Sequence, residues 1–115
     1  MKTIIAGSRT IEDTALLQRA IDEAGWDITE VVSGDAPGVD RMGEAWARRN
    51  NIPVKLFPAL WKTHKGFAGR MRNQQMAEYA DALIAIWDGC SPGTKDMLER
   101  ASKLGLKIAI RFDDE

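Results

Sequence analysis

Short apolar runs alternate with stretches of helical periodicity along this chain. The runs are rich in β-branched residues and are bounded by glycine, proline or polar turns, a pattern that predicts buried strands. We expect these strands at residues 2–6, 28–32, 53–57, 82–87 and 106–112. Between them, apolar residues recur every three or four positions, which predicts amphipathic helices. We expect these helices at residues 11–24, from the turn at 33–40 to about Asn50, at 67–79, and from the turn at 87–94 to Gly105.

Strands that alternate with helices in this way are typical of an α/β domain with a parallel sheet. We expect one domain over residues 1–115, with a Rossmann-like three-layer αβα architecture and a five-stranded, mainly parallel sheet in the order 3-2-1-4-5. Right-handed crossovers place every strand-to-helix turn at the C-terminal edge of that sheet. The switch point then lies between strands one and four, where open α/β sheets bind ligands. Residues 58–66, expected to be irregular, are a candidate lid over this edge.

The turn after the fourth strand, WDGCSPGT at residues 87–94, predicts a helix N-terminus that binds an anion. Ser91 suits the N-cap, because its hydroxyl can accept from the free amides of the first turn. Pro92 suits the first helical position, and Gly93 leaves room for a ligand beside the Thr94 hydroxyl. Unpaired amides at the positive end of a helix attract anions. Taken alone, a capped turn without a ligand is an equally good interpretation.

The spacing Gly-x-x-Pro-Gly occurs a second time, at residues 34–38 after the second strand, so two similar turns are expected along one edge of the sheet. The Gly7-Ser8-Arg9 sequence directly follows the first strand, at the expected switch point. We therefore predict ligand contacts from three turns and from the polar middle of the helix at 67–79. The candidate ligand-binding residues are Gly7, Ser8, Arg9, Ser33, Gly34, Asp35, Gly38, Arg72, Asn73, Asp88, Gly89, Ser91, Gly93 and Thr94.

The charged candidates differ in how well a structural role explains them. Arg9 is predicted to contact phosphate through its planar guanidinium group. Asp40 falls in a first helical turn, where a carboxylate is favoured for helix stability alone. Asp35 is therefore preferred as the acceptor for a ribose hydroxyl or as the activator of a water molecule. Asp35, Asp40 and Arg72 are the candidates for a catalytic role.

Composition narrows the classes of function. The net charge of −1 lacks the basic field of nucleic-acid binders. One cysteine, Cys90, and one histidine, His64, exclude an internal disulfide and a zinc site made by this chain alone. Mg²⁺ carried with ligand phosphates stays open as a cofactor. We expect no signal peptide and no membrane span, and hence a cytoplasmic protein.

Four motifs in this order, Gly7-Ser8-Arg9 and the segments at 33–40, 72–76 and 91–94, resemble the YspA/YpsA-related branch of the SLOG superfamily. That superfamily also contains the Lonely Guy cytokinin-activating phosphoribohydrolases and the Rossmann-like domain of DprA. The resemblance implies a Rossmann-like domain that binds a nucleotide or a nucleotide-derived ligand, such as an NAD-like, ADP-ribose-like or nucleoside phosphate molecule. Because Lonely Guy enzymes are dimeric, it also implies a homo-oligomer. Trp61 is then either a base-stacking side chain or part of a subunit contact, and the role of His64 stays open.

One departure from the Lonely Guy pattern bears on activity. Those enzymes carry a Gly-Gly-x-Gly-Thr-x-x-Glu turn, in which Gly93 and Thr94 match but Met97 stands at the acidic position. Glycoside cleavage commonly needs a carboxylate. We therefore expect ligand binding as a sensor or scavenger. The alternative is a hydrolase of an N-glycosidic or phosphate bond that uses Asp35 or Asp40. DprA-like nucleic-acid binding is a third hypothesis, disfavoured by the net charge.

Overall fold

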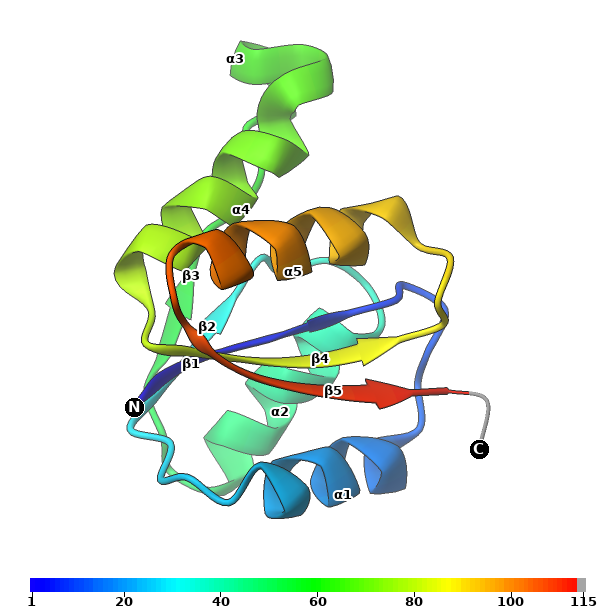
Figure 1. The fold of residues 1–115 in the computed structure, drawn as a ribbon, viewed down its shortest axis with the longest axis vertical. Coiled ribbons are helices and arrows are strands. Elements are labelled where there is room, and N and C mark those ends of the chain that lie inside the picture. The colour runs from blue at the N-terminus through cyan, green and yellow to red at the C-terminus, as the bar shows by residue number, and fades with distance from the viewer. Residues whose placement is uncertain (114–115) are drawn as a thin grey trace.

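The computed structural model describes residues 1–113 as one sheet with helices on both faces (Figure 1). The strands are β1 (Lys2–Gly7), β2 (Glu30–Ser33), β3 (Val54–Leu56), β4 (Ala82–Trp87) and β5 (Lys107–Phe112). The helices are α1 (Thr14–Ala24), α2 (Val39–Arg49), the short α3 (Trp61–His64), the 3-10 helix η1 (Lys65–Phe67), α4 (Ala68–Tyr79) and α5 (Pro92–Lys103).

All neighbouring strands pair in parallel, in the order β3-β2-β1-β4-β5. The predicted fold class and strand order are therefore confirmed. Helices α1 and α2 cover one face of the sheet, and α4 and α5 cover the other (Figure 1). Successive side chains of the central strands β1 and β4 are buried, so both faces of these strands are covered, as is typical of parallel sheets. The edge strands β3 and β5 are partly exposed.

Two apolar clusters fill the space on the two faces of the sheet. Ile5 belongs to the cluster under α1 and α2, and its neighbour Ile4 belongs to the cluster under α4 and α5. This alternation follows from the two-residue period of a strand. Trp46 is buried, whereas Trp87 is half-buried and packs against Phe112 with ring centroids 5.8 Å apart.

The pairing of β1 with β4 brings the ends of these strands to the same level. Gly7 lies opposite Ile86, and the Ser8 amide donates to the Ile86 carbonyl oxygen at 3.1 Å. A Cβ atom on Gly7 would lie 2.0 Å from that oxygen, so only glycine permits the close approach. The turns that follow β1 and β4 therefore begin side by side at the switch point of the sheet.

Several predictions for individual segments are wrong, including the following three. The segment at 58–66 is not irregular, because it contains α3 and the start of η1, which extend beyond the N-terminal end of α4 (Figure 1). Helix α1 begins three residues later than expected, since the Asp13 carboxylate accepts from the amides of Ala15 and Leu16 at 3.0 and 3.2 Å and so caps the helix there. Strand β2 begins at Glu30, where pairing with β1 begins.

Candidate functional site

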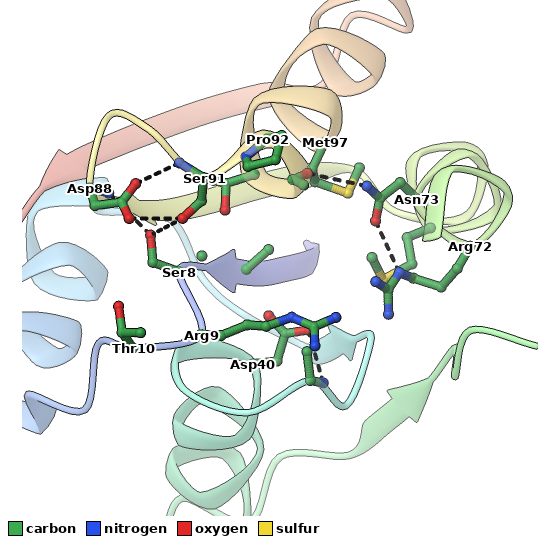
Figure 2. A pocket seen from close by; sticks show the side chains of 16 residues that line it. Ser8, Arg9, Thr10, Asp40, Arg72, Asn73, Asp88, Ser91, Pro92 and Met97 are labelled. Atoms are coloured by element: carbon green, nitrogen blue, oxygen red, sulfur yellow. Dashed lines mark hydrogen bonds between the residues drawn. The ribbon is translucent and has the colours of Figure 1, made fainter. Parts of the chain in front are cut away.

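A cavity of about 390 Å³ opens at the C-terminal ends of β1 and β4, and Figure 2 shows the side chains around it. The β1–α1 turn and the β4–α5 turn form one side, and α4 forms another. Nine of the predicted ligand-binding residues line it: Gly7, Ser8, Arg9, Arg72, Asn73, Asp88, Ser91, Gly93 and Thr94. The structure thus brings together residues from three separate motifs of the sequence.

The turn before α5 is held by Asp88, and the side chain of Ser91, the N-cap residue, makes no capping hydrogen bond to the helix. Asp88 Oδ1 accepts from the amides of Cys90 and Ser91 at 2.8 and 2.7 Å. The Ser91 hydroxyl instead donates to Asp88 Oδ2 at 2.8 Å and lies 3.1 Å from the Ser8 hydroxyl. These hydrogen bonds lower the pKa of Asp88 to about 2, so its carboxylate is ionised at neutral pH. The prediction that Ser91 caps the helix through its side chain is therefore wrong.

Two backbone amides at this helix start remain free. Within residues 1–113, the amides of Gly93 and Thr94 have no hydrogen-bond acceptor, whereas the next amide, that of Lys95, donates to the Ser91 carbonyl oxygen at 3.2 Å. Both residues line the cavity, and a Cβ atom added at Gly93 would meet no atom within 4 Å, so the backbone at Gly93 borders open space. An anion placed there would accept two hydrogen bonds at the positive end of α5.

Two arginines supply positive charge to the same cavity. Arg9 leaves the end of β1 and is exposed, and Arg72 reaches in from α4 and is half-buried (Figure 2). Burial and the nearby Arg9 both lower the pKa of Arg72, and Asp40 counteracts them. Among residues 1–113, the ion pairs of arginine involve Arg41, Arg48, Arg100 and Arg111, and neither Arg9 nor Arg72 takes part in one. Two mutually repelling cations that lack an ion pair favour the arrival of an anion.

The structure separates the two candidate aspartates. Asp40 lines the cavity and is buried, with Oδ2 accepting from the Ala36 amide at 3.3 Å. Burial raises the pKa of Asp40 to about 6, although backbone amides and Arg72 pull it down. Asp35, the preferred candidate, does not line the cavity and lies 3.5 Å from the Arg41 guanidinium. The geometry therefore favours Asp40 as the carboxylate that meets a ligand.

The two turns with the Gly-x-x-Pro-Gly spacing have different conformations. In the first, Asp35 and Gly38 are left-handed, with φ of 58° and 81°, and Gly38 is the N-cap of α2. In the second, Gly89 is left-handed and Pro92 is the first residue of α5. The expectation of two similar turns is wrong, because a shared spacing of glycine and proline does not fix the φ of the residues between them.

Four other predicted ligand-binding residues lie at the β2–α2 turn and outside the cavity lining, namely Ser33, Gly34, Asp35 and Gly38. The buried Ser33 hydroxyl donates to Glu44 at 2.7 Å, beneath the turn. Arg72 Nη1 donates to the Gly34 carbonyl oxygen at 2.8 Å, and a Cβ atom on Gly34 would lie 2.2 Å from that Nη1. A Cβ atom on Gly38 would lie 2.5 Å from the carbonyl oxygens of Ser8 and Arg9. These glycines let Arg72 and the β1–α1 turn pack against the β2–α2 turn. Gly89 also lies outside the lining.

Residues at the tip of the molecule do not reach the cavity. Trp61 packs over Gly69 and keeps 54% of its surface exposed, and neither Trp61 nor His64 lines the cavity. Residues 1–113 contain no group of three or more His, Cys, Asp or Glu side chains arranged to hold a metal ion. In the same part of the chain, each helix is too short or too polar to cross a bilayer.

The cavity also involves residues that the sequence did not single out as ligand contacts. Met76 and Met97 form apolar wall, and Asp96 bonds to Asn73 from just outside it. The inward methionines fit the helical period of α4 and α5. Asp96 gives no such indication, because a charged residue in the second turn of a helix is ordinarily solvated.

The fold and the cavity define a Rossmann-like domain with a cleft at the sheet switch point that contains charged side chains. A model of the YspA, cpYpsA-related SLOG family matches residues 1–64, from β1 to α3. The match spans more than half of the chain, and the protein belongs to this family. It covers the Gly7-Ser8-Arg9 turn and the β2–α2 turn, whereas Arg72 and the α5 turn lie beyond it. No curated protein and no solved structure matches the chain. Membership of this family is consistent with binding of a nucleotide-related ligand.

Proposed function

We propose that this protein binds a nucleotide or a nucleotide-derived ligand in the cavity at the β1/β4 switch point, as a sensor or scavenger. The observation that carries the proposal is the convergence of two free amides, those of Gly93 and Thr94, with the guanidinium groups of Arg9 and Arg72. Free amides at a helix start together with arginines are the means by which proteins bind phosphate.

Other parts of the lining suit the rest of a nucleotide. The Asp40 carboxylate can accept hydrogen bonds from ribose hydroxyls, and the more accessible Ala36 and Pro92 in the lining offer apolar contact for a base. The volume of about 390 Å³ lies in the lower part of the ~300–1,000 Å³ range of small-molecule sites. We expect a nucleoside phosphate to fit within the cavity, and a larger NAD-like or ADP-ribose-like ligand to extend from its mouth.

The first experiment identifies the ligand. Mass spectrometry of small molecules released from the denatured purified protein is expected to find a nucleoside phosphate or an ADP-ribose derivative. Calorimetric titration with AMP, ADP-ribose and NAD then ranks the three classes. A protein that releases nothing and binds none of them contradicts the proposal.

A matched pair of arginines on α4 tests the site. Arg72 lines the cavity, whereas Arg70, two residues earlier, is exposed with its guanidinium 4.7 Å from the centre of the Phe67 ring. A charge-assisted hydrogen bond contributes roughly 1.5–3 kcal/mol. We therefore expect Arg72→Ala to weaken AMP binding at least about tenfold and Arg70→Ala to leave it unchanged. Equal losses in both variants would indicate a diffuse electrostatic effect without a defined site.

The alternative function, hydrolysis of an N-glycosidic or phosphate bond, is supported by one observation. Asp40 is a carboxyl group that lines the cavity and whose pKa is raised to about 6, as a general acid requires. Met97, however, occupies the acidic position of Lonely Guy enzymes and is buried in the wall. We expect no release of adenine from AMP on prolonged incubation followed by chromatography. Release that Asp40→Asn abolishes would establish the hydrolase.

A further inference from the structure

We infer that Asp96 is a positioning residue, which acts through Asn73 to hold the guanidinium of Arg72 at the cavity. The inference deepens the proposed function and rests on it for the effect on ligand affinity. Asp96 lies outside the cavity lining, whereas both Asn73 and Arg72 lie within it.

A continuous chain of hydrogen bonds joins α5 to Arg72. Arg100 Nε and Asn73 Nδ2 both donate to Asp96 Oδ2 at 2.9 Å. Arg72 Nε donates to Asn73 Oδ1 at 3.0 Å, a contact that Figure 2 shows beside the cavity. Asn73 is buried, and the side chains of Asp96 and Arg100 are 24% and 28% exposed. These hydrogen bonds are therefore shielded from most of the solvent.

Asp96 determines which way the Asn73 amide points. A carboxylate only accepts hydrogen bonds, and an arginine Nε only donates them. With Nδ2 on Asp96, the oxygen of Asn73 must face Arg72. A flipped amide would place two donors, Nδ2 and Arg72 Nε, against each other. Without Asp96, the amide loses the strongest of the contacts that select the productive orientation.

The same amide also connects the loops that form the site. Asn73 Nδ2 lies 3.3 Å from the Gly93 carbonyl oxygen at the start of α5. Arg72 Nη1 donates to the Gly34 carbonyl oxygen in the β2–α2 turn at 2.8 Å. Two donors of Arg72 are thus fixed by protein acceptors, which leaves the remaining edge of the guanidinium for a ligand.

A change of charge and a change of position predict opposite effects on affinity. Removal of a carboxylate near an anion site should strengthen anion binding by Coulomb's law. If Asp96 positions Arg72, its removal should weaken binding instead. The sign of the change in AMP affinity therefore separates the two mechanisms.

The first test needs no ligand. In ¹H–¹⁵N NMR spectra of the wild type, the Nε–H of Arg72 should give a slowly exchanging peak, assigned by its loss in Arg72→Ala. Asp96→Ala should broaden this peak or accelerate its exchange at least about fivefold, because the Asn73 acceptor is no longer held. Asp96→Asn retains a carbonyl acceptor for Asn73 and should preserve the peak. A wild type without a protected Arg72 peak, or a peak unchanged in Asp96→Ala, overturns the inference.

The second test measures binding of AMP by calorimetric titration. Asp96→Ala should weaken binding at least about threefold, whereas Asp96→Asn should restore most of the affinity. Glu99→Ala removes an exposed carboxylate from the same helix and should leave the affinity unchanged or slightly higher. In the Arg72→Ala background, Asp96→Ala should cause no further loss.

The outcomes distinguish this inference from the proposed function. Tighter or unchanged AMP binding in Asp96→Ala overturns the inference and leaves the proposed function intact. Equal weakening of AMP binding in Asp96→Ala and Asp96→Asn also overturns the inference and leaves the proposed function intact. A wild type that binds no nucleotide but shows the protected Arg72 peak, lost in Asp96→Ala, contradicts the proposed function and supports the positioning role of Asp96.

Discussion

The buried carboxyl group of Asp40 is expected to destabilise the fold at neutral pH. Asp40 is 5% exposed, and burial raises its pKa from 3.8 to about 6. As the pH rises, the unfolded chain releases this proton near pH 3.8 and the folded protein releases it near pH 6. Between these values the folded protein binds more protons, so the free energy of unfolding falls as the pH rises. At about 1.4 kcal/mol for each pKa unit, the loss amounts to about 3 kcal/mol and is complete above pH 6.

Replacement of Asp40 by asparagine removes this loss without removing the acceptor. The amide oxygen of Asp40→Asn can still accept from the Ala36 amide, which lies 3.3 Å from Oδ2 in the wild type. We expect the variant and the wild type to be about equally stable at pH 4. At pH 7.5 the variant should be more stable by up to about 3 kcal/mol, with the difference appearing between pH 4 and 6.

Urea denaturation followed by tryptophan fluorescence at several values of pH measures the difference, since titrating groups that do not interact with Asp40 cancel between the two proteins. Asp35→Asn is the matched control, because Asp35 lies in the same turn but is half-exposed, and asparagine tolerates its left-handed backbone. The control should change stability by less than about 0.5 kcal/mol. A stability difference for Asp40→Asn that does not vary with pH, or that favours the wild type at pH 7.5, would refute the reasoning. A carboxylate that lowers stability in this position fits a role in ligand contact.

Three further predictions address the site and the assembly. Arg9→Ala should weaken AMP binding at least about tenfold in calorimetric titration. The melting temperature should change little, because Arg9 is exposed and its charge repels Arg72. Unchanged affinity would remove Arg9 from the site. Crystals grown with phosphate should show the anion on the amides of Gly93 and Thr94, and an empty position there beside anions bound elsewhere would contradict this. Exposed apolar side chains on α3, η1 and α4, namely Trp61, Phe67 and Met71, predict a homo-oligomer through this surface. Light scattering at micromolar concentration should give a multiple of the chain mass that Phe67→Glu reduces to the monomer.

The sequence by itself determined the order of the elements and the edge of the sheet that carries the cavity. The apolar runs that became β1 and β4 are local patterns, and their burial on both faces follows from composition alone. The handedness of crossovers then limits the strand order to few alternatives, so the switch point followed from the pattern of strands and helices. Gly7, Ser8, Gly93 and Thr94, which were predicted as ligand contacts, line the cavity because each ends or follows a strand, or begins a helix, beside that point.

Only the tertiary structure decided which charged side chains meet in the cavity. Asp35 and Asp40 lie in the same segment between β2 and the first turn of α2. The residue pattern did not predict the left-handed φ of Asp35. Asp35 lies beside Arg41, whereas Asp40 lines the cavity. The contact of Asp96 with Asn73 joins residues from two helices, and its geometry depends on how α4 and α5 pack over the sheet. Strand and helix patterns come from neighbours in the chain, but the direction of a charged side chain is set by partners far away in the sequence.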